Sequence, residues 1–65
     1  MSNMNNIQSE LEGIVNTLTA AINDAEKFDS GNASAGTRVR KAAMEATKNL
    51  KTLRAQVTDI KNTRD

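Results

Sequence analysis

Positive side chains in the second half of this chain are the residues with the clearest chemical role. Of its nine Lys and Arg residues, eight follow Gly31. Arginine and lysine on an exposed helix neutralise nucleic-acid phosphates and release the counterions held there. Such contacts carry no base information, so we expect binding to a phosphate backbone without readout of sequence. The candidate site consists of Arg38, Arg40, Lys41, Lys48, Lys51 and Arg54.

Arg38, Arg40 and Lys41 are the first cluster of positive charge and the predicted main contact. They follow the expected start of a helix, where free backbone amides and the positive end of the helix dipole also favour anions. The alternative is that these side chains form ion pairs, either across a turn or between chains. The acidic residues available for that are Glu10, Asp24, Glu26 and Asp29.

Charge is distributed unequally between the two halves. Residues 1–30 hold one lysine and five acidic residues, a net charge of −4, whereas residues 31–65 hold eight basic and three acidic residues, a net charge of +5. This asymmetry indicates either a polyanionic partner or charge pairing within an assembly. Phe28 is the only aromatic residue, so base stacking on single strands is not expected.

Residues for catalysis and metal binding are scarce. The chain has no histidine and no cysteine, which removes the usual general base, thiol nucleophile and metal ligands. Gly31 and Gly36 have the spacing of a phosphate loop, but Thr37 and Arg38 follow where Lys and Ser or Thr are required. We therefore expect no enzyme activity, no cofactor and no metal, and interpret Gly36 as a close-packing site for Phe28.

A long amphipathic helix is expected before the cationic stretch. Apolar residues recur there at alternating spacings of three and four, the pattern of a helix with one packed face. Proline is absent throughout, so nothing forces a break. The pattern predicts a helix over about 3–30. Its packed positions are Met4, Ile7, Leu11, Ile14, Leu18, Ala21, Ala25 and Phe28.

Residues 29–32 predict a tight turn into a second helix over about 32–63. Gly31 suits the left-handed residue that follows a helix, and Asn32 suits the N-cap of the next one. Since the turn is short, the helices should be antiparallel with their packed positions facing each other. The alternative is one unbroken helix through Gly31. The second set of packed positions is Gly36, Val39, Ala43, Ala46, Leu50, Leu53, Val57 and Ile60.

The expected fold is all-α, an antiparallel two-helix hairpin that forms a single domain over residues 1–65. A chain this small buries a modest core, and Val15, Ile22 and Met44 lie off the packed positions. We therefore expect copies to pair into a homo-oligomeric helical bundle, most simply a dimeric four-helix bundle. No apolar run reaches the roughly 18 residues of a membrane span, so a membrane is not an expected partner.

The turn and second helix resemble the chlamydial-type histone-like proteins, small bacterial proteins likened to the eukaryotic linker histone. Their characteristic run, Gly-Asn-x-x-Ala-Gly-Thr-Arg-x-Arg-Lys, is met between Gly31 and Lys41. The resemblance covers about residues 25–54, and the eleven-residue run is its most specific part. Further matching positions are Glu45, Lys48, Leu50, Lys51 and Arg54.

The resemblance implies a nucleoid-associated protein of the cytoplasm. It would bind duplex DNA without sequence preference and contribute to DNA organisation or compaction. Chlamydial members carry a long Lys- and Ala-rich tail that has no counterpart in these 65 residues, so the implied fold is better supported than DNA condensation. Two other functions remain open. One is an oligomerisation or adaptor module acting through helical protein–protein contacts, and the other is an RNA-binding helical hairpin dimer.

Overall fold

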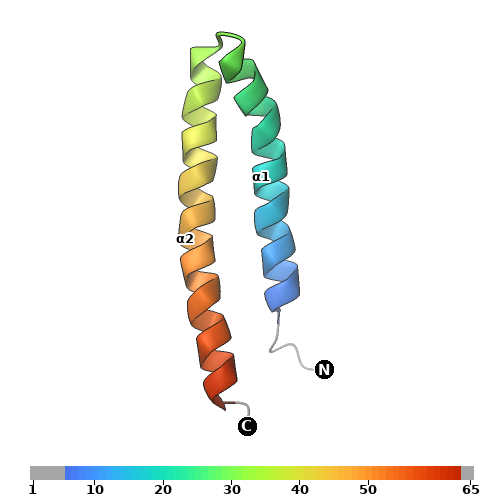
Figure 1. The fold of residues 1–65 in the computed structure, drawn as a ribbon, viewed down its shortest axis with the longest axis vertical. Coiled ribbons are helices and arrows are strands. Elements are labelled where there is room, and N and C mark those ends of the chain that lie inside the picture. The colour runs from blue at the N-terminus through green and yellow to red at the C-terminus, as the bar shows by residue number, and fades with distance from the viewer. Residues whose placement is uncertain (1–5, 64–65) are drawn as a thin grey trace.

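Two antiparallel helices make up the part of the chain that the computed structural model describes, residues 6–63 (Figure 1). They are α1 (Ile7–Asp29) and α2 (Ala33–Thr63). The all-α hairpin predicted from the sequence is confirmed, and one unbroken helix through Gly31 is excluded. Met4 and the start of the predicted first helix lie outside the described residues.

Backbone hydrogen bonds close the turn between the helices. The Asn32 amide nitrogen donates to the carbonyl oxygen of Lys27 at 3.0 Å, and the Gly31 amide nitrogen donates to that of Phe28 at 2.9 Å. This is the Schellman arrangement, in which the residue after the helix is left-handed. Gly31 has a φ of 109°, which glycine adopts because it has no Cβ. The predicted role of Gly31 is confirmed.

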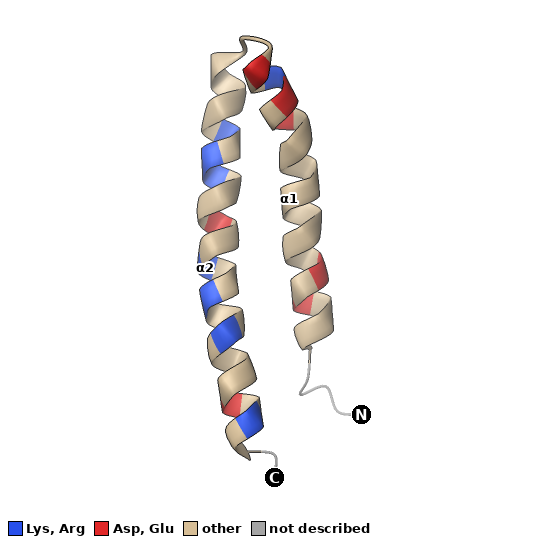
Figure 2. Ribbon diagram, in the orientation of Figure 1, with Lys and Arg blue, Asp and Glu red and all other residues tan. Residues whose placement is uncertain are grey.

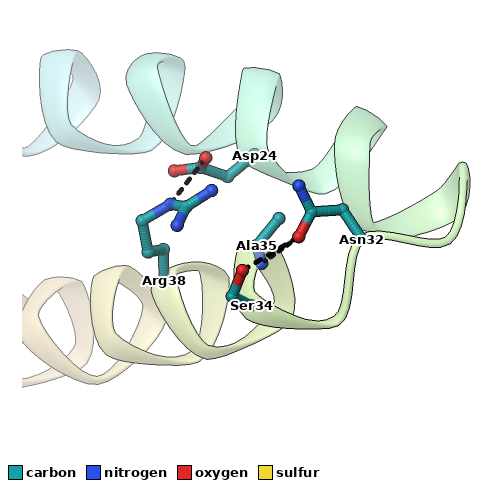
Figure 3. Close-up of polar contacts among 5 residues, drawn as sticks. All are labelled: Asp24, Asn32, Ser34, Ala35 and Arg38. Atoms are coloured by element: carbon teal, nitrogen blue, oxygen red, sulfur yellow. Dashed lines mark hydrogen bonds and ion pairs between the residues drawn. The ribbon is translucent and has the colours of Figure 1, made fainter.

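Asn32 caps the start of α2, as predicted. Its side-chain Oδ1 accepts the Ala35 backbone N–H at 3.3 Å and the Ser34 hydroxyl at 3.0 Å (Figure 3). The first of these bonds satisfies an amide that the opening turn of a helix otherwise leaves free. The two helix ends at the turn are therefore fixed by local chemistry.

Gly36 lies directly against the ring of Phe28. A Cβ built on Gly36 would lie 2.6 Å from Cδ1 and 2.7 Å from Cε1 of that ring, which is inside van der Waals contact. A larger residue at this position would therefore have to displace Phe28. The interpretation of Gly36 as a close-packing site for Phe28 is confirmed.

The core between the helices is small. Among the described residues, the buried side chains are Ile14, Ala35, Ala46 and Leu53. All of these except Ala35 form one cluster, against which Ile7 packs. Two helices share a single line of contact, so each buries one row of side chains and its flank. The wide apolar stripe of an amphipathic helix needs a second neighbour to be covered. A hairpin with this core is marginally stable by itself.

Several predicted packed positions lie outside the contact between the helices. Five large ones stay exposed: Leu11 at 43%, Leu18 at 41%, Phe28 at 52%, Leu50 at 39% and Val57 at 37%. The contact between the two helices therefore does not enclose these side chains. The contact leans toward the other flank, where Thr17, Asp24, Ala42 and Gln56 are partly buried. Helix separation depends on side-chain size, and α2 presents its small alanines on that flank.

The exposed aliphatic rows form one apolar face of the hairpin. On each helix the exposed row lies four residues after the row buried between the helices, a step of about 40° around the helix axis in the same rotational sense. Because the helices are antiparallel, equal rotations carry both rows to the same side. Val15 and Ile22 widen the row on α1 and are 53% and 66% exposed. The apolar face consists of Leu11, Val15, Leu18, Ile22, Leu50 and Val57.

Candidate nucleic-acid interface

Positive charge is concentrated on α2 and negative charge on α1 (Figure 2). Helix α2 carries seven Lys and Arg residues and two acidic residues, a net charge of +5, while α1 carries one lysine and five acidic residues, a net charge of −4. All seven cations of α2 are exposed. Their summed field therefore reaches solvent along the length of one helix.

Four of the predicted site residues lie on the side of α2 that faces away from α1. Lys41, Lys48 and Lys51 are each two positions from a residue packed toward α1, which is about 200° around the helix axis. Arg40 is eleven residues, or about three turns, from Lys51 and shares its line. This surface, the basic edge, consists of Arg40, Lys41, Lys48 and Lys51.

Arg54 and Met44 take different places beside these cations. Arg54 lies one position after a buried leucine, about 100° around the axis, so it flanks the basic edge on the side of the apolar face. Met44 lies two positions before the buried Ala46 and is 67% exposed. It lines a shallow groove with Lys48 and Lys51. Met44 therefore lies beside the cations of the basic edge rather than on the apolar face.

Arg38 is paired with the acidic helix. Its Nε donates to Oδ1 of Asp24 at 3.0 Å, close to the turn (Figure 3). The side chain of Arg38 is 50% exposed and that of Asp24 is 24% exposed. A solvated pair of this kind contributes about 0–1 kcal/mol, so a phosphate group can compete with Asp24. Within residues 6–63 this is the only ion pair, so the acidic groups of that part of the chain leave its other cations unpaired.

The cationic cluster begins beyond the first turn of α2. Arg38 is the sixth residue of a helix that starts at Ala33, and the effect of the helix dipole falls off within the first turn. Asn32 already accepts one of the first-turn amides. The attraction of anions to Arg38, Arg40 and Lys41 therefore comes from their own charges rather than from the helix start.

Lys61 is an exposed cation that is not among the site residues predicted from the sequence. It lies seven residues after Arg54 and on the same side of α2. The spacing of seven is visible in the sequence, but the exposure of Lys61 is known only from the structure. Lys61 extends the positive surface toward the open end of the hairpin.

Three further features of residues 6–63 concern metals, membranes and a buried amide oxygen. No group of three or more His, Cys, Asp or Glu residues there is placed to hold a metal ion. No helix in this part of the chain is long and apolar enough to cross a membrane. The side-chain Oε1 of Gln56 is buried without a hydrogen-bond partner, at the flank where the two helices touch.

Comparison with known families matches residues 1–63 to the family described as histone H1-like protein Hc1. Comparisons with curated proteins and with solved structures found no match. The family match spans both helices and the turn, so the resemblance noted in the sequence is confirmed. The chain therefore belongs to the histone H1-like Hc1 family, a family of DNA-binding nucleoid proteins.

Proposed function

We propose that this protein binds duplex DNA through phosphate contacts along α2, without sequence specificity, and contributes to the organisation or compaction of DNA at the nucleoid in the cytoplasm. The observation that carries the proposal is the basic edge. Its cations are exposed, unpaired within the described residues, and turned away from the acidic helix. Membership of the histone H1-like Hc1 family supports DNA as the polyanion that these cations bind.

The length of the basic edge sets how many phosphates one copy can reach. Arg40 and Lys51 are eleven residues apart, which is about 16 Å along a helix. Duplex DNA carries one negative charge for about each 1.7 Å of its axis, so a row of this length meets several phosphates. Arg54 continues the row at the rim of the apolar face. Arg38 is proposed as a further contact that forms when a phosphate replaces Asp24.

The apolar face supports a second part of the proposal, self-association into a homodimer or higher oligomer. Contiguous exposed apolar patches on small proteins commonly mark association sites. An oligomer would also multiply the few phosphate contacts available to one copy, because linked sites bind with avidity.

The salt dependence of duplex binding tests the phosphate contacts. Lys48→Ala combined with Lys51→Ala should weaken binding to all duplex sequences alike and lower the slope of log affinity against log salt by about two. Lys27→Ala is the matched control, because it removes an exposed cation from α1. Circular dichroism should show unchanged helicity in every variant.

Three outcomes would contradict the proposal. An unchanged salt slope in the double variant would remove the basic edge from the interface. Tighter binding of duplex RNA than of duplex DNA would favour the RNA-binding hairpin. Absence of binding to either duplex at low salt would leave the adaptor function, in which the cations pair with acidic protein surfaces.

A further inference from the structure

We propose that two copies stack apolar face to apolar face with α1 of one copy over α2 of the other, so that their basic edges point in opposite directions and one dimer bridges two DNA duplexes. The inference rests on the proposed function, because the bridged ligand is the duplex held by each basic edge. It adds the arrangement of the dimer and the consequence of that arrangement for DNA.

The broad side of the hairpin that carries the apolar face is large enough to hold a second copy. The hairpin measures 52 × 19 × 11 Å between Cα extremes, so its broad face is on the order of 1,000 Å², close to the roughly 800 Å² that each partner buries in a standard interface. The six aliphatic side chains of the apolar face are 37–66% exposed. A two-fold axis between copies lets the same patch serve both partners.

Two stackings are compatible with two-fold symmetry between flat hairpins. When the axis runs along the helices, α1 of one copy lies over α2 of the other and both turns are at the same end. When the axis runs across the helices, each helix lies over its own counterpart and the turns are at opposite ends. Both arrangements cover the apolar face, so burial of that face does not decide between them.

Charge decides between the two stackings. Helix α1 has a net charge of −4 and α2 a net charge of +5. The first stacking brings each acidic helix against a basic one, whereas the second brings like charges together along both helix pairs. Complementary potentials favour association and juxtaposed like charges oppose it. The observed charges therefore favour the stacking in which α1 of one copy lies on α2 of the other.

The favoured stacking fixes the direction of the basic edges. It places the two α2 helices at opposite corners of a four-helix bundle. Each basic edge faces away from the α1 of its own copy, so the two edges face apart. One duplex cannot lie against both, whereas two duplexes can. In the other stacking both α2 helices lie on one side and would form a single broad surface that coats one duplex.

The distance between the two turns tests the arrangement directly. The chain has no cysteine, so Ala33→Cys, at an exposed position at the start of α2, provides a single site for a nitroxide label. With helix axes 8–10 Å apart in the bundle, same-end turns should give a label separation of about 15–30 Å. Turns at opposite ends would give a separation near the 52 Å length of the hairpin and would overturn the proposal, as would absence of any coupling between labels.

Bridging is tested by capture of a fluorescent duplex on beads that carry a second duplex and the protein. Ile22→Asp places a charge in the apolar face at a side chain that is 66% exposed, so it should reduce capture at least tenfold. Asn23→Asp adds the same charge at the next residue, outside the apolar face, and should capture like the unmodified protein. Capture that Ile22→Asp leaves unchanged would overturn the inference.

Binding of a single duplex, measured in parallel, separates this inference from the proposed function. Normal single-duplex binding without capture by the unmodified protein would reject bridging and leave the proposed function in place. Failure to bind even one duplex would reject both. If Ile22→Asp also loses helicity, the label separation in the otherwise unmodified protein decides.

Discussion

Individual residues at the turn show how one atom can set local stability. Gly36 gives the Phe28 ring room that a Cβ would occupy, while Gly13, inside α1, has nothing within 4 Å of a built Cβ. Both glycines lie in helices, where alanine is favoured over glycine by about 1 kcal/mol. The two positions therefore separate helix propensity from packing.

We predict that Gly13→Ala raises the free energy of unfolding by about 0.5–1 kcal/mol. Gly36→Ala should show none of this gain, because its Cβ would lie 2.6 Å from the Phe28 ring. Urea denaturation at one fixed protein concentration measures both changes. Gly36→Ala should show the propensity gain when it is added to Phe28→Ala and compared with Phe28→Ala alone. Equal effects of alanine at both glycines in the presence of Phe28 would refute the packing role of Gly36.

The ion pair between Arg38 and Asp24 determines whether Arg38 is available to contact a phosphate. We predict that Asp24→Asn strengthens duplex binding and steepens the salt slope by up to about one, because Arg38 is released to contact a phosphate. The stability cost should stay below about 1 kcal/mol, as expected for a solvated pair.

Glu12→Gln is the control for that prediction, since it removes an exposed acidic charge from α1 that forms no ion pair in residues 6–63. It should strengthen binding through net charge alone, with little change in salt slope. Identical salt slopes for the two variants would show that Arg38 stays away from the DNA.

At the scale of the helices, α2 has two surfaces with different uses. One flank packs small residues such as Ala35 and Ala46 against α1, and the opposite side carries the basic edge. The apolar row containing Leu50 and Val57 lies between these surfaces. Because these surfaces lie at different angles around the helix axis, one amphipathic helix could contact its hairpin partner, a second copy and DNA at once in the proposed assembly.

The acidic residues of α1 are likewise kept apart from the basic edge of α2. Their charges lie away from the basic edge, so they weaken DNA binding less than acids on α2 would. In the proposed dimer they would also supply the complementary charge for α2 of the second copy. Replacing Lys48 and Lys51 should therefore weaken DNA binding, whereas replacing Ile22 with a charged residue should weaken the proposed association of copies.

For the whole molecule, the small core means that the proposed assembly of copies would contribute directly to folding. Four side chains are buried in the described hairpin, whereas the six aliphatic side chains of the apolar face are exposed. Each large aliphatic side chain that becomes fully buried contributes about 1.5–3 kcal/mol. In the proposed assembly, most of the available hydrophobic stabilisation would therefore lie between copies.

We predict that the thermal denaturation midpoint rises with protein concentration across the micromolar range, because association stabilises the folded state by mass action. Leu18→Asp should abolish this dependence, since a charge buried between copies is costly. Sedimentation of the unmodified protein at the same concentrations should show a dimer or larger species. A folded monomer whose midpoint is independent of concentration would contradict the prediction.

Local sequence chemistry determined the hairpin, its turn and the uneven charge. Gly31 and Asn32 specify a turn through backbone geometry and capping that involve only near neighbours, so they could be identified without the fold. The cations of α2 are likewise evident from composition. The alternating spacing of three and four also identified which side of each helix is apolar.

Tertiary structure decided how that apolar stripe is divided. The spacing fixes a stripe of about 100° but not which part of it meets the other helix. Small residues on one flank of α2 let the helices approach there, so Leu11, Leu18, Leu50 and Val57 were left on the outside. The same rotation brought Asp24 within reach of Arg38 and turned the basic edge away from α1, since a rigid helix moves all of its faces together.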